Sequence, residues 1–168
     1  MLYPIGIQSF EDIRRCGYVY VDKTELIYKL AATGKYYFLS RPRRFGKSLL
    51  VSTMEAYFQG KRELFEGLAI ASLEKDWVEY PVLHFDLSGA SYTDMEALND
   101  KIGRQLETLE SRFGVVKKYK TFSVRFDNLI ECAFNKTGRQ VVILIDEYDK
   151  PVIDNLDRPE LQDKMRET

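Results

Sequence analysis

Blocks of apolar and polar residues alternate along this chain in a way that predicts strands and helices in turn. Three short apolar runs, at 36–39, 82–87 and 141–145, have the length and the aromatic or β-branched content of buried strands. The last of them, VVILI, is typical of a strand that helices cover on both faces of a parallel sheet. Alternation of such runs with helical segments predicts an α/β fold.

Helical periodicity fills most of the chain between these runs. Apolar residues recur there at spacings of three and four, and glycines follow several of the periodic segments, as expected at helix C-termini. The predicted helices lie at about 9–16, 24–32, 48–59, 93–112 and 123–135, with one or two short helices in 61–80. Ser9 is a plausible N-cap for the first helix.

A basic loop, KYYFLSRPRRFGKSLL, joins the first apolar run to a helix. A strand, a tight loop and a helix N-terminus in this order form a cradle for phosphate, because loop N–H groups and the helix dipole both favour an anion. Gly46 lets the backbone approach a phosphate closely, and Lys47 can reach its oxygens. The Ser48 hydroxyl is suited to ligate Mg²⁺.

This loop departs at one position from the phosphate-loop pattern G-x-x-x-x-G-K-[ST]. The first glycine of the pattern falls on Arg41, so a side chain stands where the strand turns into the loop, although Pro42 stiffens the turn by fixing its φ. The predicted nucleotide contacts come from Arg43, Arg44, Phe45, Gly46, Lys47, Ser48 and Leu49. For the two arginines, a solvated basic loop is an equal alternative.

Two adjacent carboxylates, Asp146 and Glu147, follow the third apolar run. Ligands bind at the carboxyl ends of the strands in open α/β sheets, so both acids are expected at that edge. Asp146 is suited to hold Mg²⁺, directly or through water, and Glu147 to polarise an attacking water as general base. The alternative is an ordinary strand-end aspartate that caps the next helix, beside a solvated glutamate.

Composition excludes several classes of function. The net charge of the 168 residues is −1, so no global field directs the protein to DNA or to a membrane. The cysteines, Cys16 and Cys132, form no CxxC pair, and the single histidine, His84, excludes a His-rich zinc site. No apolar run reaches the roughly 18 residues of a membrane span, and no signal peptide is evident, so we expect a cytoplasmic protein.

Three blocks of the sequence resemble the predicted AAA-ATPase-like family of bacterial proteins: YVDKT at 20–24, FLSRPRRFGKS at 38–48 and ILIDEYDKP at 143–151. The resemblance implies a P-loop NTPase, a three-layer α/β/α fold with a mostly parallel sheet, that binds ATP and Mg²⁺ and hydrolyses ATP. It implies that Lys47 and Ser48 belong to the Walker A motif and contact phosphate and metal. Asp146 and Glu147 correspondingly belong to the Walker B motif and serve metal binding and water activation.

The same resemblance implies a domain organisation and a set of partners. We expect residues 1–168 to form a single P-loop domain that is cut short after the Walker B strand, with 1–34 as lead-in helices and 35–168 as the nucleotide-binding core. Family members commonly carry a PD-(D/E)XK nuclease-like domain after this one. The expected partners are therefore ATP, such a nuclease-like domain or nucleic acid, and further copies in an oligomer, but not a membrane.

Other interpretations stay open at this point. Because Arg41 replaces a glycine and later strands are missing, the chain could be a degenerate nucleotide-binding or interaction module that regulates a nuclease-like partner. A GTPase is a weaker alternative, since the sequence has no N-K-x-D motif. Asp86, which ends the second apolar run, is a candidate for an outer position of the metal site. Residues 22–24 would either border the adenine or simply cap a helix.

Overall fold

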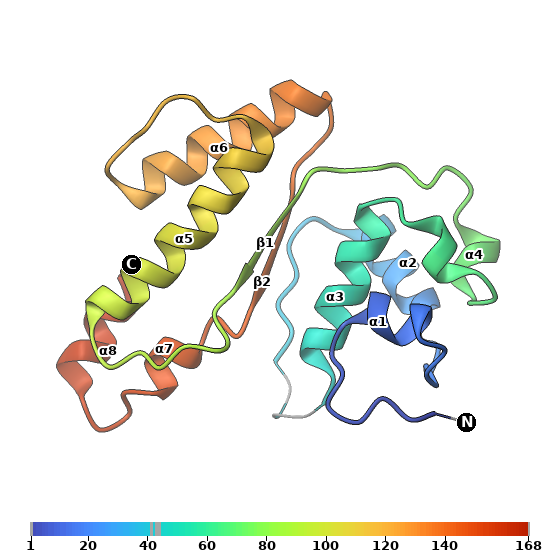
Figure 1. Ribbon diagram of the computed structural model, residues 1–168, viewed down its shortest axis with the longest axis horizontal. Coiled ribbons are helices and arrows are strands. Elements are labelled where there is room, and N and C mark those ends of the chain that lie inside the picture. Colours follow the sequence, from blue (N-terminus) through green and yellow to red (C-terminus); the bar gives the residue numbers. More distant parts are fainter. Residues whose placement is uncertain (1, 41, 43–44, 168) are drawn as a thin grey trace. The chain divides into compact units, whose positions relative to one another are not determined.

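Two compact units make up the chain, an N-terminal unit, Met1–Tyr80, and a C-terminal unit, Pro81–Thr168. The computed structural model describes residues 2–40, 42 and 45–167 (Figure 1). The predicted phosphate loop falls in the first unit and the predicted acids in the second. Each unit is therefore described by itself.

Short helices packed around an aromatic centre form the N-terminal unit. They are α1 (Phe10–Arg15), α2 (Thr24–Thr33), α3 (Lys47–Phe58), the 3₁₀ helix η1 (Arg62–Phe65) and α4 (Ile70–Leu73). The buried core consists of Phe10, Ile27, Ala56, Leu64, Phe65 and Ile70. Trp77 packs against this core, with its ring centroid 5.2 Å from that of Phe65.

The first helix starts where the sequence predicts. The Ser9 hydroxyl accepts a hydrogen bond from the Asp12 N–H at 3.2 Å, so it supplies one of the acceptors that the first turn lacks. Lys61 and Arg15 both form ion pairs with Glu11, at 2.7 Å and 2.8 Å. These hydrogen bonds, with Lys61 first, hold the pKa of Glu11 below its usual value.

A two-stranded parallel sheet and two long helices dominate the C-terminal unit. Its elements are β1 (Val82–Asp86), α5 (Met95–Phe113), α6 (Phe122–Thr137), β2 (Val142–Asp146), α7 (Lys150–Ile153) and α8 (Pro159–Arg166). The strands pair in register from Val82 with Val142 to Asp86 with Asp146. The chain therefore leaves β1, crosses through α5 and α6, and returns beside it in β2, as parallel pairing requires.

The apolar periodicity of α5 and α6 has a direct structural counterpart. Side chains from both helices pack against β1 in one buried cluster, made of Leu83, Phe85, Leu106, Leu109, Phe113, Leu129 and Ala133. Asp94 caps α5 by accepting from the Ala97 N–H at 2.8 Å. Gly114 and Gly138 end the two helices in left-handed conformations, so both predicted helix ends are confirmed.

The prediction of a buried strand at 36–39 is wrong for the described structure. These residues form no strand, and Tyr36 and Phe38 are 95% and 72% exposed. Tyr37 folds back onto α2 instead, where its hydroxyl donates to the Leu30 carbonyl at 2.6 Å. An apolar run indicates a preference for burial, but it does not supply the neighbouring strand that burial in a sheet needs.

The expectation that helices cover both faces of β2 is also wrong. Leu144 is buried, whereas Ile143 and Ile145 are 39% and 53% exposed. Among the described residues, β2 has one strand neighbour, β1, so its other edge is unpaired. The fold class is α/β, but the described sheet has two strands, and the third predicted strand does not join it.

Candidate functional site

Gly46 is the residue on which the phosphate-loop half of the site depends. It occupies the N-cap position of α3 with φ 75° and ψ 26°, in the left-handed region. A Cβ at this position would meet no atom of the described residues within 4 Å, but its backbone would be strained, because L residues rarely adopt that conformation. The glycine is thus required by the turn that leads into α3, and not by a close neighbour.

The first turn of α3 presents the features of an anion site. Lys47, Ser48 and Leu49 form this turn, and all three are half-buried. The turn contains no acidic residue, and no side chain among the described residues caps it. Its backbone N–H groups and the positive end of the helix dipole therefore remain available for a negatively charged ligand.

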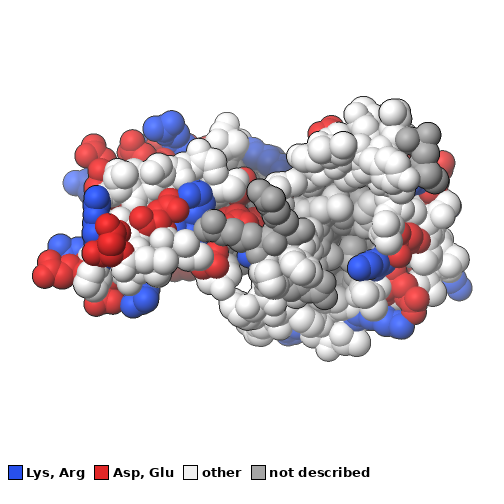
Figure 2. All heavy atoms as spheres, turned by 90° about the horizontal axis from the view of Figure 1, so that it is seen from below, with Lys and Arg blue, Asp and Glu red and all other residues white. Residues whose placement is uncertain are grey.

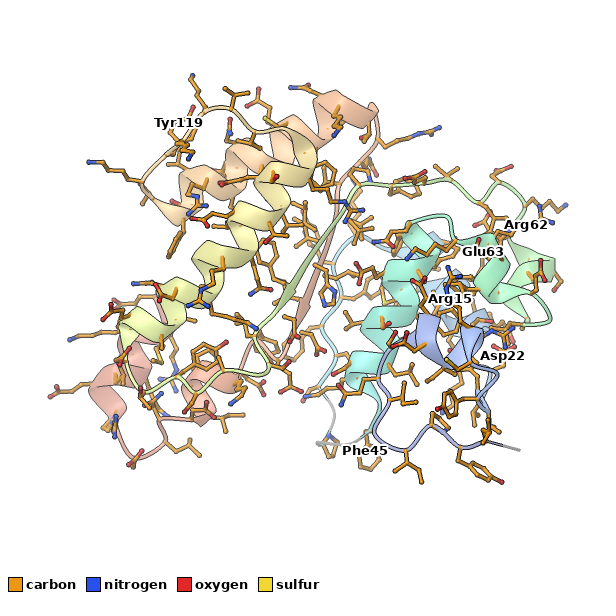
Figure 3. All side chains as sticks on the ribbon, in the orientation of Figure 1. Arg15, Asp22, Phe45, Arg62, Glu63 and Tyr119 are labelled. Carbon is orange, nitrogen blue, oxygen red and sulfur yellow. The ribbon has the colours of Figure 1, made fainter. Side chains whose placement is uncertain are left out.

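The rest of the predicted loop is only partly described. Phe45 lies at the start of α3 with 64% of its surface exposed, and Figure 3 shows its ring at the end of the helix. Arg41, Arg43 and Arg44 lie outside the described residues, so their predicted roles stay predictions.

The segment before α2 has a structural role that the sequence left open. The Asp22 carboxylate accepts hydrogen bonds from the Thr24 N–H, the Thr24 hydroxyl and the Ala69 N–H, at 2.8, 2.7 and 2.7 Å. Burial raises the pKa of Asp22, but these hydrogen bonds outweigh it and lower the pKa below its usual value. The bonds join the start of α2 to α4, which favours the helix-cap interpretation over an adenine contact.

The acidic half of the site stands at the carboxyl end of β2. Asp146 is 7% exposed, and its Oδ1 accepts the Glu147 N–H at 3.0 Å. Since α7 begins after Asp149, Asp146 is not the N-cap of that helix. Glu147 has φ 53°, a conformation that is uncommon for a residue with a Cβ and that recurs at functional sites.

A second carboxylate, Asp86, ends the neighbouring strand. It is the register partner of Asp146, and side chains at paired positions project from the same face of a sheet. The Ser88 N–H and hydroxyl donate to the two Asp86 oxygens at 2.7 and 2.8 Å. Carboxylate oxygens of this kind suit Mg²⁺, which needs only one or two from the protein when phosphates and water complete its shell. No cluster of three or more metal-ligating acids, histidines or cysteines occurs in the described ranges.

Sequence reasoning missed Tyr92 and Asn155, which brace this edge of the sheet. Both are essentially buried, with 0% and 1% of their surfaces exposed, and the Asn155 amide donates to the Tyr92 carbonyl. They lie 63 positions apart, in polar segments without periodicity, so no local pattern links them. Only the contact between them in the folded structure indicates their role.

Charge on the face seen in Figure 2 does not single out another site. On the face in Figure 2, acidic and basic side chains are interspersed rather than separated by sign, in keeping with the net charge of −1. Within the part of the chain that the structure describes, no helix combines the length and apolar character that crossing a bilayer requires.

Comparison with known proteins shows which family the chain belongs to. The sequence model of the family described as "Predicted AAA-ATPase" matches residues 4–168. A protein of Azotobacter chroococcum mcd 1, described as an uncharacterized protein in the vnfD 5′ region, is 43% identical over 166 residues. That match covers 98% of this chain but 32% of the relative, so the chain spans about a third of the relative's length. No solved structure gives a significant match. On the family match and the shared identity, the chain belongs to the predicted AAA-ATPase family.

Proposed function

We propose that this chain is the nucleotide-binding part of a P-loop ATPase that binds ATP with Mg²⁺ and, in the intact protein, hydrolyses its terminal phosphoanhydride bond. The observation that carries the proposal is the start of α3, where a left-handed Gly46 leads into a helix turn with Lys47 and Ser48 that no described side chain caps. Family membership supports nucleotide binding as such. In this proposal the chain is one P-loop domain in a three-layer α/β/α arrangement.

Each residue of the first turn has a distinct role in the proposal. The N–H groups of Gly46–Leu49 donate to the phosphate oxygens, and the Lys47 ammonium neutralises charge on the terminal phosphates. Arg43 and Arg44 add further positive charge, and Phe45 borders the nucleotide. Gly46 makes the turn possible, since no other residue adopts its backbone conformation without strain.

Oxygen ligands for Mg²⁺ come from Ser48 and Asp146 in this proposal. The carboxylate pair of Asp86 and Asp146 fits a divalent cation, because two negative charges at paired strand positions repel each other unless a cation lies near. When bound, Mg²⁺ neutralises charge on the transferring phosphoryl group. The Asp146 carboxylate orients this ion or its water shell, and Asp86 holds an outer position.

Glu147 is the proposed general base. Its carboxylate follows directly on Asp146 and accepts a proton from the attacking water as the bond to the terminal phosphate breaks. Lys47 and Glu147 belong to different units of the structure, so their convergence on one nucleotide is part of the proposal.

Nucleotide affinity of the Lys47→Ala variant tests the binding half of the proposal. Titration of Mg-ATP into the intact protein should show binding for wild type and a loss of about ten-fold or more for Lys47→Ala. Lys29→Ala is a matched control, because Lys29 is an exposed residue of α2 paired with Glu25. Equal affinities for wild type and Lys47→Ala would overturn the proposal.

Turnover by the Glu147→Gln variant tests the catalytic half. The amide keeps the size of the side chain but cannot accept the proton, so ATP binding should persist while hydrolysis falls by roughly 10²-fold or more. Glu131→Gln, on the exposed face of α6, is the control that removes an acid elsewhere in the same unit. Unchanged hydrolysis in Glu147→Gln would show that another group activates the water.

A second candidate, an interaction module for a nuclease-like partner or nucleic acid, is favoured by one observation. The extended segment 35–40 exposes large apolar side chains, among them Tyr36 and Phe38, which is typical of surfaces that bind a partner. This module would act without hydrolysis, in the cytoplasm, as a monomer or an oligomer. Association that is identical with and without ATP would favour it over the ATPase.

A further inference from the structure

We propose that Tyr92 and Asn155 are positioning residues that clamp the turn carrying Glu147 against the loop that follows β1. The inference rests on the proposed function, since it assigns to these two residues the placement of the proposed general base. Neither residue contacts the nucleotide in this proposal. They act through the backbone of the segment 147–151.

Tyr92 fixes the loop that leaves β1. Its side chain is fully buried, and its hydroxyl donates to the Leu87 carbonyl at 2.7 Å, one residue beyond the last paired position of the strand. Burial, together with the negative charges of Asp86 and Asp154, raises the pKa of Tyr92 to about 12, so the hydroxyl stays a donor. The loop after β1 is thus tied to the end of its own strand.

Asn155 connects this loop to the turn after β2. One side-chain amide group donates both to the Tyr92 carbonyl and to the Pro151 carbonyl of α7, the second at 2.9 Å. A neutral side chain with two donor hydrogens is needed to satisfy two buried carbonyls at once. Aspartate has the same size but cannot donate to both, and alanine can donate to neither.

Lys150 links the turn that carries Glu147 to Tyr92 and Asp154. Its backbone N–H donates to the Glu147 carbonyl at 3.0 Å, and its ammonium lies 5.7 Å from the centre of the Tyr92 ring. The ammonium also pairs with Asp154 at 2.6 Å, and Asp154 accepts from the Tyr92 N–H at 3.3 Å. The turn is therefore held by the strand at Asp146 and by the clamp at Lys150.

The backbone of Glu147 explains why such a clamp is needed. A left-handed conformation at a residue with a Cβ persists only when the surrounding structure holds it. Without the clamp, the turn would relax to ordinary backbone angles and the carboxylate would change direction. Misplacement of a reacting group by about 1 Å is enough to lower a rate by roughly 10²-fold.

The Asn155→Ala variant of the intact protein tests the proposal with two measurements. The first is steady-state kinetics, in which kcat should fall by about ten-fold or more while KM for Mg-ATP stays within about two-fold, because a positioning residue affects the reacting geometry and not the phosphate loop. The second is amide hydrogen exchange, in which the segment 147–151 should exchange faster.

Leu129→Ala is the matched control for general destabilisation. Leu129 is fully buried in the α5–α6 core of the same unit, so its truncation lowers the melting temperature without touching the clamp. Well below its melting temperature, this variant should keep kcat and the exchange of 147–151. Tyr92→Phe removes only the hydroxyl bond to Leu87 and should show a smaller effect in the same direction as Asn155→Ala.

The outcomes separate this inference from the proposed function. If wild type hydrolyses ATP and Asn155→Ala has the same kcat, the clamp is overturned while the proposed ATPase activity stands. Absence of turnover in wild type overturns the proposed ATPase activity, and hydrogen exchange alone then tests the clamp. Faster exchange at 147–151 in Asn155→Ala but not in Leu129→Ala supports the clamp. Equal exchange in the two variants overturns it. If Asn155→Ala does not fold, Tyr92→Phe takes its place. A lower kcat with faster exchange at 147–151 then supports the clamp, and no change in either overturns it.

Discussion

Asp86 and Asp146 are register partners at the ends of β1 and β2, so two carboxylates project side by side from one face of the sheet. Paired like charges of this kind destabilise a sheet by up to about 1 kcal/mol relative to neutral pairs. Ser88 donates two hydrogen bonds to the Asp86 carboxylate, whereas the Asp146 carboxylate accepts one within the described structure, from the Glu147 N–H. A divalent cation would turn this repulsion into attraction.

We therefore expect Mg²⁺ alone to raise the melting temperature of the wild-type protein. Asp146→Asn should lose this response, because the amide keeps its acceptor for the Glu147 N–H but no longer provides a negative charge. Differential scanning calorimetry with and without Mg²⁺ is the measurement. Asp149→Asn, three residues further along, should respond to Mg²⁺ as wild type does. An identical response in Asp146→Asn would remove this residue from the metal site.

Replacement of Gly46 by alanine should destabilise the start of α3. The left-handed backbone costs roughly 1–2 kcal/mol for a residue with a Cβ, although a methyl group would meet no atom of the described residues there. Gly103→Ala is the opposite control. Gly103 lies inside α5, where a Cβ would make ordinary contact with the Phe122 ring at 3.8 Å, and alanine should stabilise the helix by up to about 1 kcal/mol.

Thermal melts followed by circular dichroism would compare the two glycine variants. The expected signs are opposite, with Gly46→Ala below wild type and Gly103→Ala at or above it. Equal stability of Gly46→Ala and wild type would show that the turn adopts a different backbone in solution.

Glu147→Gly should separate stability from activity. Glycine adopts φ 53° without strain, so the variant is expected to be more stable than an alanine variant at the same position, by about 1 kcal/mol. Both variants lack the carboxylate and should lose ATP hydrolysis. Chemical denaturation of the Gly and Ala variants gives the difference in free energy. A more stable alanine variant would contradict the left-handed conformation.

Acid should weaken the N-terminal unit partly through Asp22. Its pKa is lower in the folded protein than its usual value of 3.8, so its contribution is present above that pH and is lost as the pH falls through the lower, folded pKa. Fluorescence of Trp77, the single tryptophan, reports unfolding of this unit, because Trp77 packs on its core.

Melts of Asp22→Asn at falling pH check this expectation. The variant should be less stable than wild type at neutral pH. The difference should begin to shrink as the pH falls below the usual value of 3.8, because the carboxylate of the unfolded chain takes up its proton before that of the folded protein. Glu63→Gln alters an exposed acid of η1 in the same unit and should follow wild type (Figure 3). A constant difference between Asp22→Asn and wild type across this range would count against the hydrogen-bonded carboxylate.

Local sequence patterns predicted helices and strands well where the apolar periodicity and the residues at the element ends indicate the same structure. The apolar period of α5 and the glycine that follows it, Gly114, predicted one helix. The run VVILI at 141–145 predicted β2 within one residue at each end. The glycine before Lys47 likewise predicted the start of α3. In each case, neighbouring residues carry the information.

Patterns failed where the outcome depends on distant partners. The run at 36–39 has the composition of a strand but pairs with no strand in the described structure, and Ile143 stays exposed for lack of a neighbour. The contact of Asn155 with Tyr92 spans 63 positions and leaves no trace in periodicity. The predicted meeting of Lys47 with Glu147 is of the same kind, and it stays a prediction.

The unpaired edge of β2 has a practical consequence for handling the protein. Its exposed Ile143 and Ile145 flank backbone groups that have no strand partner among the described residues. Such an edge can recruit other extended chains and start aggregation. Concentrated solutions of this polypeptide should thus turn cloudy with β-rich precipitate, and a lysine at position 143 should keep them clear.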